Sequence, residues 1–247
     1  MGQRLFSSIG IALAASAVMA AAPPPVGAPA PTFQPGDTWV FDRTHEQGTA
    51  DFKDERFNLK IESVNSDSMV VGFKPDGAPQ DYQDRIMGLD WSQSRVFDEK
   101  PTVTGRPFAF PMSIGATWSV DYTDPRQKGT KLSDHVHTDY KVVGWEDVTT
   151  PAGAFHALKI ESNGLEELKV VLPASAGASS ITTPSGAAAL SQVQRQRIGV
   201  VRVVLRDQIF YAPSVKYYAK IVSEQYNADG VRTMRNTDTL VSFKPGA

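Results

Sequence analysis

Cysteine is absent from this chain of 247 residues. Disulfide bonds, thiolate metal sites, iron–sulfur clusters, cysteine nucleophiles and lipid attachment through an N-terminal cysteine are therefore excluded. We accordingly expect no cofactor and a protein that is not a lipoprotein. A chain of this length can bury a sizeable core without cross-links, and it allows either one large domain or two small ones.

An excess of positive charge is also missing. The 25 lysines and arginines are matched by 27 aspartates and glutamates, which gives a formal net charge of −2. Because proteins that bind nucleic acid or an anionic membrane surface carry a basic footprint, the composition predicts neither partner. One basic run exists, and we interpret it as a solvated strand or helix face or, alternatively, as a patch for an anionic ligand: Arg195, Arg197, Arg202 and Arg206.

A long apolar run occurs only near the N-terminus, at residues 5–19. It is shorter than the roughly 20 residues of a spanning helix, and small residues and three prolines (23–25) follow it. This layout predicts a signal peptide over residues 1–22, cleaved after Ala20 or Ala22. The expected product is a periplasmic or secreted protein without a membrane span after processing. A retained N-terminal anchor is the alternative.

Residues 23–35 are rich in proline, alanine and glycine and predict a solvated tether, and residues 36–247 then form a single β domain. Short runs rich in β-branched and aromatic residues, separated by Gly, Pro, Asn and Asp, are typical of strands. The expected strands are 37–42, 55–64, 67–74, 83–89, 92–97, 116–123, 134–147, 154–162, 165–172, 200–211, 215–226 and 231–243.

Apolar and polar residues alternate within these runs, which indicates an antiparallel sheet with one face exposed to solvent. In 55–64, Phe57, Leu59, Ile61 and Ser63 alternate with polar residues, and the last run alternates less cleanly. Few short helices are expected, with 188–198 as the best candidate. We therefore predict a mainly β fold, an antiparallel curved sheet or open half-barrel.

Residues 173–190 contain no charged residue and almost no large side chain, which predicts a flexible loop inside the domain. The loop is either a plain insertion or a lid over a ligand cleft, because long loops in compact domains often serve as lids.

Three short sequence motifs occur twice. The motif Gly-x-Thr-Trp is found at 36–39 and 115–118, Leu-Lys-Ile-Glu-Ser at 59–63 and 158–162, and Phe-Lys-Pro at 73–75 and 243–245. The same order in both halves favours two related lobes, at about 36–108 and 109–247. Chance recurrence of strand-forming words is the alternative.

Residues 114–118, 142–160 and 210–216 together carry the pattern G-x-x-W … V-x-G-x-E-x-V-T-x-P-A-G-x-F-x-A-x-K-I … [WF]-[FY]-A-P-x-V. In this they resemble a group of exported bacterial β-proteins of uncharacterised function. The resemblance implies a curved antiparallel sheet or half-barrel in the cell envelope, similar to lipoprotein-carrier folds, and implies no catalytic residues. The chain departs from the group at Lys216, where glycine is usual.

His135, His137 and Asp139 fall on one face of an expected strand, because side chains two apart point the same way. Two imidazoles and a carboxylate are plausible zinc or copper ligands. A solvated strand face explains the same residues without a metal, and we favour that interpretation because no fourth ligand is evident.

Catalytic motifs are scarce. The chain has no Gly-x-Ser-x-Gly elbow and no His-Glu-x-x-His word. Acid–base pairs for glycoside hydrolysis are conceivable at Glu161 with Glu166 and Glu167, or at Asp121 with Asp124. Clustered carboxylates are also common in surface turns of soluble proteins.

The aromatic residues are the most informative candidates. Trp39 and Trp118 are assigned to the core, whereas Trp91, Trp145, Tyr211 and Tyr218 are predicted to wall a cleft on the concave side of the sheet. The predicted function is non-enzymatic binding of a small hydrophobic or amphiphilic envelope ligand or partner. The alternative is a hydrolase of envelope glycans or esters.

Overall fold

The computed structural model describes residues 27–48, 51–172, 180–182, 188–190 and 197–246. Residues 1–22, which carry the predicted signal peptide, and most of the predicted loop 173–190 lie outside the described residues. The elements are β1 (Gly27–Ala28), β2 (Thr38–Gln47), β3 (Asp51–Val64), β4 (Ser68–Pro75), β5 (Gln83–Gly88), β6 (Gln93–Phe97), β7 (Lys100–Gly105), β8 (Met112–Ser113), β9 (Thr117–Asp124), β10 (Lys131–Thr150), β11 (Gly153–Leu172), β12 (Ser180–Thr182), β13 (Ala188–Leu190), β14 (Arg197–Ala212), a 3₁₀ turn η1 (Pro213–Val215), β15 (Tyr217–Tyr226) and β16 (Arg232–Lys244).

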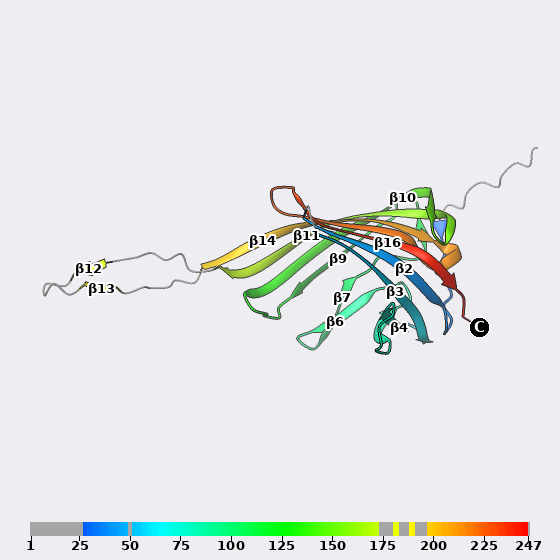
Figure 1. Ribbon diagram of the computed structural model, residues 1–247, viewed down its shortest axis with the longest axis horizontal. Helices are drawn as coiled ribbons and strands as arrows, with labels where there is room; N and C mark the ends of the chain where they lie inside the picture. The colour runs from blue at the N-terminus through cyan, green and yellow to red at the C-terminus, as the bar shows by residue number, and fades with distance from the viewer. Residues whose placement is uncertain (1–26, 49–50, 173–179, 183–187, 191–196, 247) are drawn as a thin grey trace, which may run out of the picture.

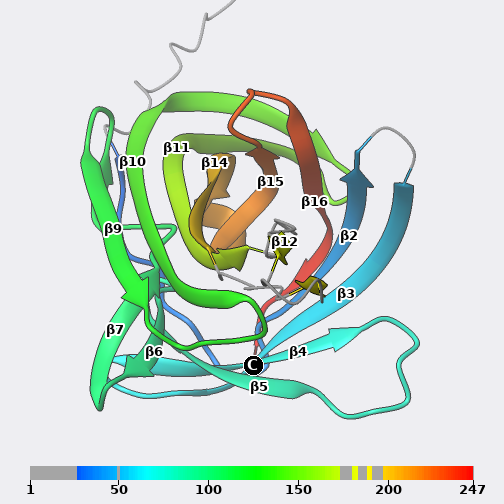
Figure 2. The same cartoon turned by 90° about the vertical axis from the view of Figure 1, so that its left-hand side faces the viewer.

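Ten strands form one antiparallel sheet in the order β5-β4-β3-β2-β16-β15-β14-β11-β10-β9. Seen end on, the sheet bends into an arc whose two edge strands, β5 and β9, do not pair with each other (Figure 2). The prediction of a mainly β, antiparallel curved sheet is thus confirmed. Short turns join β3 to β4 and β10 to β11, whereas the neighbours β2 and β16 come from opposite ends of the chain.

Most expected strands are present, with shifted ends. The runs 154–162 and 165–172 form the single strand β11, since Asn163 and Gly164 stay paired with β10 and β14. The strand β7 was missed because Pro101 and Gly105 interrupt its pattern. The helix expected at 188–198 is wrong for those of its residues that the structure describes. Residues 188–190 belong to β13 and residues 197–198 to β14.

Alternation decides which side chains face the core, and β-bulges interrupt it. Phe57, Leu59 and Ile61 are buried as expected, but Ser63 is exposed because the register shifts between Ile61 and Ser63. A similar shift in β16 follows Leu240, which is fully buried. A period of two therefore predicts each face only up to the next bulge.

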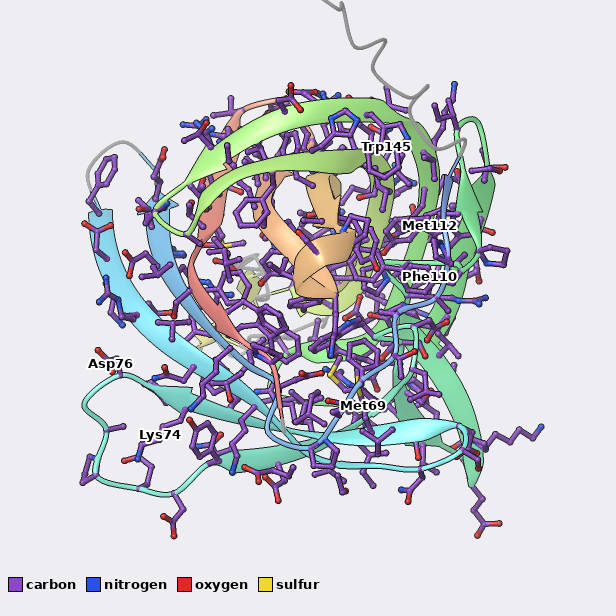
Figure 3. The ribbon with its side chains drawn as sticks, turned by 90° about the vertical axis from the view of Figure 1, so that its right-hand side faces the viewer. Met69, Lys74, Asp76, Phe110, Met112 and Trp145 are labelled. Atoms are coloured by element: carbon purple, nitrogen blue, oxygen red, sulfur yellow. The ribbon has the colours of Figure 1, made fainter. Side chains whose placement is uncertain are left out.

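The core is richest in aromatic rings at the end of the arc where β2, β3 and β15 meet η1. Trp39 is fully buried, lies edge-on to Trp91 with ring centroids 5.5 Å apart, and donates its Nε1–H to the Val215 carbonyl at 2.7 Å. Figure 3 shows Met69, Phe110 and Met112 among the side chains that fill the arc, whereas Lys74 and Asp76 lie at the outer end of β4 and in the turn that follows it.

Part of the predicted tether is packed instead of solvated. Gly27 and Ala28 pair with β8, and Phe33 lies edge-on to Trp91 at 5.6 Å. Ala28 and Phe33 are both buried, because these two apolar side chains cover the aromatic end of the core.

The Gly-x-Thr-Trp motif has the same local structure at both of its positions, 36–39 and 115–118. Gly36 and Gly115 both have positive φ, at 90° and 85°. Each donates its N–H to the next strand, to the carbonyls of Ile61 and Val142 respectively. In the second half, Val142 of β10 therefore takes the structural place of Ile61. The residue that matches Ile61 in the repeated Leu-Lys-Ile-Glu-Ser motif is Ile160, but it lies one strand farther on, in β11. The division of the domain into two lobes remains a prediction.

The β6–β7 hairpin lies between the two edges of the arc (Figure 2). Phe97 stacks on Tyr122 of β9 with centroids 6.3 Å apart, and the Arg126 guanidinium lies 5.0 Å from the Phe97 ring. Beside them Asp124, buried at 4% exposure, accepts hydrogen bonds from the Arg126 backbone N–H and guanidinium. These contacts attach the hairpin to one edge of the sheet.

We expect Asp124→Asn to weaken the fold at neutral pH and to alter its response to acid. The hydrogen-bonded Arg126 guanidinium holds the pKa of the Asp124 carboxyl well below its ordinary value of 3.8. A lowered folded-state pKa means that the carboxylate stabilises the fold above about pH 4, and that this contribution is lost as the pH falls toward the folded-state value.

Urea unfolding measured from pH 7 to pH 3 tests this. The wild type should lose stability more steeply than Asp124→Asn below about pH 5. Asp229→Asn, in the exposed turn before β16, is the matched control and should leave the curve unchanged. Parallel curves for the wild type and Asp124→Asn would contradict the assignment.

Candidate functional site

A cavity of about 240 Å³ lies on the concave face of β2–β5, where it meets β15 and the turn after β5. Most of its wall is apolar or aromatic, and two arginines and a glutamine complete it: Arg43, Phe57, Leu59, Val71, Phe73, Arg85, Met87, Trp91, Gln93, Tyr217 and Tyr218. Small-molecule sites of roughly 300–1,000 Å³ have this mixture of apolar wall and few polar groups. The cavity therefore suits part of a ligand, such as one apolar segment.

Trp91 closes the cavity on one side from a tight turn. Its backbone φ of 62° lies in the left-handed region, which bulky residues seldom adopt, and its N–H is bonded to the Gly88 carbonyl at 2.9 Å. The indole stacks on the Tyr217 ring with centroids 3.7 Å apart. This packing holds Trp91 in an otherwise unfavourable backbone conformation.

A partly buried charge network begins in the cavity wall at Arg43. Asp238, at 4% exposure, accepts two hydrogen bonds from the Arg43 guanidinium at 2.6 and 2.7 Å and one from the Tyr218 hydroxyl at 3.1 Å. Hydrogen bonding to Asp238 raises the pKa of Arg43, so this cation stays charged and paired. Because Asp238 satisfies Arg43, the wall contains a charge without presenting a free one to a ligand.

The two tyrosines of the wall are neutral at physiological pH. Burial raises the pKa of both Tyr217 and Tyr218 above the ordinary value of 10.0. Neither tyrosine therefore adds a negative charge to the aromatic wall at physiological pH.

Arg85 differs from Arg43 because it is exposed and lies at the rim of the cavity. Its guanidinium lies 5.5 Å from the centre of the Phe73 ring, and it forms no ion pair with any residue that the structure describes. A cation in this position is available to an anionic group at the end of an apolar ligand.

The structure brings two of the four predicted wall residues together. Trp91 and Tyr218 line the cavity. Tyr211 is buried elsewhere in the core, with its ring 5.0 Å from Phe108. Trp145 lies on β10, where its ring stacks on His156 with centroids 5.0 Å apart, and it does not line this cavity.

Sequence reasoning missed several lining residues. The alternation of 55–64 already placed Phe57 and Leu59 on the dry face, but nothing local linked them to a cavity. Arg85 and Met87 belong to β5, whose inward side is recognisable only once its pairing with β4 is known.

The predicted metal candidates lie on one face as expected. Asp121 of β9 contacts both His135 and His137, at 3.4 and 2.9 Å, and His137 also contacts Asp139 at 3.3 Å. Hydrogen bonds to Asp121 and Asp139 raise the pKa of His137, which favours the imidazolium and opposes metal binding. Among the described residues no group of three or more such side chains has the geometry of a metal site.

The carboxylates considered for acid–base chemistry do not converge. Pairing with β10 places Glu166 opposite Val136 and Glu161 opposite Lys141, on opposite faces of β11. Glu167 shares the face of Glu161 but lies about 20 Å farther along the strand and pairs with Arg202 at 2.7 Å. The same alternation separates Asp121 from Asp124, because they are three residues apart on β9. The carboxyl next to Glu166 is instead Asp134, and burial, followed by this neighbour, raises the pKa of Glu166.

No protein-family model matches the chain, and no curated protein sequence matches it significantly. Solved structures are similar at low identity. A predicted lipoprotein from Parabacteroides distasonis ATCC 8503 has a TM-score of 0.42 at 12% identity, covering 88% of this chain and 97% of its own. A predicted exported protein with a YmcC-like fold from Bacteroides fragilis has a TM-score of 0.41 at 16% identity, covering 89% and 99%. Within the described residues, no helix has the length and hydropathy needed to cross a membrane.

Proposed function

We propose that the protein is exported, loses residues 1–22, and binds a hydrophobic or amphiphilic envelope ligand on its concave face without chemical conversion. The observation that carries this proposal is the cavity walled by Phe57, Trp91 and Tyr217, with Arg85 at its rim. An apolar segment enclosed by these rings gains by leaving water, and an anionic end reaches the arginine.

Titration with a fluorescent fatty acid and with its uncharged alcohol tests the proposal. Saturable binding of both in the micromolar range is expected, with a change in tryptophan emission because Trp91 walls the cavity. The absence of saturable binding, with unchanged tryptophan emission, would overturn the proposal.

Arg85→Gln should weaken binding of the fatty acid by roughly fivefold and leave the alcohol unaffected, because an exposed charge pair contributes up to about 1 kcal/mol. Arg95→Gln is the matched control, since Arg95 is a half-exposed arginine of β6 outside the cavity. Equal losses in the two variants would show that general charge, and not the rim position, governs binding.

Met87→Trp should fill the cavity and abolish binding of both probes. Met87 is 8% exposed and lines the wall, so a larger side chain has to occupy the enclosed space. Overpacking costs about 1–3 kcal/mol, so circular dichroism must first show that the variant is folded. A folded variant with unchanged affinity would place the ligand elsewhere.

A further inference from the structure

The β6–β7 hairpin is a separate element of the fold, placed between the two edges of the arc (Figure 2). Its strands pair with each other, and among the described strands neither pairs with the ten-stranded sheet. A two-residue turn at Asp98 and Glu99, both with positive φ, closes the hairpin tightly. The hairpin is therefore one stiff body, joined to the sheet by the chain at its base and by side-chain contacts.

The base of the hairpin is firmly held. The chain enters through the turn 88–92, in which Trp91 is only 1% exposed. Asp90 in this turn accepts a hydrogen bond from the Arg106 guanidinium at 2.7 Å, which joins the two ends of the hairpin. The Arg106 carbonyl accepts the Nε1–H of Trp118 of β9 at 2.8 Å. These contacts fix the base in place.

The tip of the hairpin is held by far fewer contacts. Of its eleven strand residues, five in β6 and six in β7, only Phe97 is buried. The Phe97 ring stacks on Tyr122 of β9 and lies 5.0 Å from the Arg126 guanidinium, and we call these two contacts the latch. Arg95 adds one ion pair with Asp124, but at 4.0 Å and with a side chain that is 55% exposed it contributes little.

The hairpin also borders the cavity. Gln93, its first residue, lines the cavity together with Arg85 and Met87 of the edge strand β5. No described strand bridges the hairpin and β5, so no strand pairing closes the cavity on this side. At about 240 Å³ the cavity is smaller than the roughly 300–1,000 Å³ of small-molecule sites, so a whole ligand needs a wall that gives way.

We propose that the β6–β7 hairpin is a gate that turns about its base, and that ligands enter and leave the cavity when the latch at Phe97 is released. The inference rests on the proposed binding of an amphiphilic ligand in this cavity. Elements with few buried apolar contacts open at a low free energy. A hairpin that closed the gap permanently would bury more than one side chain, because buried apolar area is what holds a docked element in place.

A gate is recognised by the rates of binding. When the ligand passes only through the open state and binds the open and closed states equally, its association and dissociation rates both scale with the open fraction. The dissociation constant then stays the same. A change in the cavity wall alters the dissociation constant instead.

Phe97→Ala removes the latch. Stopped-flow mixing with the fluorescent fatty acid should show both rates raised about tenfold at an unchanged dissociation constant, because an aromatic pair and a cation–π contact are lost together. Val96→Ala is the matched control, since Val96 is 65% exposed and lies on the other face of β6. Both of its rates should equal those of the wild type.

The absence of cysteine allows a covalent bond to replace the latch. Phe97→Cys with Tyr122→Cys, where the native ring centroids lie 6.3 Å apart, is treated with a short bismaleimide, which joins the hairpin to β9, or with N-ethylmaleimide, which does not. The joined protein should bind and release the fatty acid about tenfold more slowly, or slower still, because opening is prevented. Equal rates for the two products would overturn the inference.

Spin labels measure the opening without a ligand. One label replaces Ile86 of β5, which is 76% exposed, and the other replaces Val96 of the hairpin. Pulsed electron paramagnetic resonance should give one narrow distance distribution for this pair. Adding Phe97→Ala should broaden the distribution or add a second distance, and an unchanged distribution would overturn the gate.

The outcomes separate the gate from the proposed function. Saturable binding with rates and distances that do not respond to Phe97 would overturn the gate and leave ligand binding in place. The absence of saturable binding would overturn the proposed function and the gate's role in it, and the distances would then show only whether the hairpin moves.

Discussion

Replacing Asp37 by alanine is expected to lower the free energy of unfolding by about 3–5 kcal/mol, the cost of breaking a buried ion pair. Asp37 is fully buried and accepts hydrogen bonds from the Lys216 ammonium at 2.8 and 3.0 Å. It also accepts the backbone N–H groups of Gln34 and Gly246 at 3.0 and 2.9 Å. One carboxylate thus joins the chain before β2, the turn after η1 and the C-terminal segment.

Lys216 makes this prediction specific to the chain. It has a φ of 60°, in the left-handed region that favours glycine. The bond to Asp37 offsets the backbone strain. Lys216→Gly should therefore relieve strain but leave the Asp37 carboxylate without its cation, and the double variant should lose less than the sum of the single losses.

Urea unfolding followed by far-ultraviolet circular dichroism measures these differences. Asp42→Asn is the control, because the Asp42 carboxylate also pairs with a cation, Arg56, but its side chain is 46% exposed. Its loss should stay within about 1 kcal/mol. Equal losses for Asp37→Ala and Asp42→Asn would contradict the special role of the buried pair.

Trp39→Ala is expected to cost about 3–5 kcal/mol, as for large aromatic side chains deleted from a core. The ring is fully buried, packs against Trp91, Tyr217 and Phe243, and satisfies the Val215 carbonyl through Nε1. Its removal leaves a void at the aromatic end of the core and an unbonded carbonyl.

Trp118, in the second Gly-x-Thr-Trp motif, is the control residue. Like Trp39, Trp118 contacts a tyrosine ring and a carbonyl: it stacks on Tyr140 with ring centroids 5.3 Å apart and donates its Nε1–H to the Arg106 carbonyl at 2.8 Å. Its ring is only half-buried, so Trp118→Ala should cost less than Trp39→Ala in the same unfolding experiment. A reversed order would contradict the assignment of Trp39 as the central core residue.

Local sequence rules predicted the strands well because strand pairing keeps side chains alternating at a fixed period. They failed at Ser63 and within β16, where a bulge adds one residue and exchanges the two faces. Bulges depend on how a strand fits its neighbours, so the sequence of one strand does not reveal them.

The candidate site shows the same division between local and long-range information. Trp91 and Tyr218 were predicted from residue type and lie in the cavity, whereas Tyr211 and Trp145 are of the same types and lie elsewhere. Residue type indicates that an aromatic side chain will be buried. Which rings share one cavity depends on β2–β5 meeting β15 across the arc.

By itself, the sequence determined the chemistry that this protein lacks, its β character and the layout of its N-terminus, because these follow from composition and from patterns within single segments. Only the tertiary structure decided that β16 pairs with β2 and that Arg85 lies at the rim of an aromatic cavity. Such features arise from contacts between residues far apart in the chain, and neither the net charge nor any local pattern contains them.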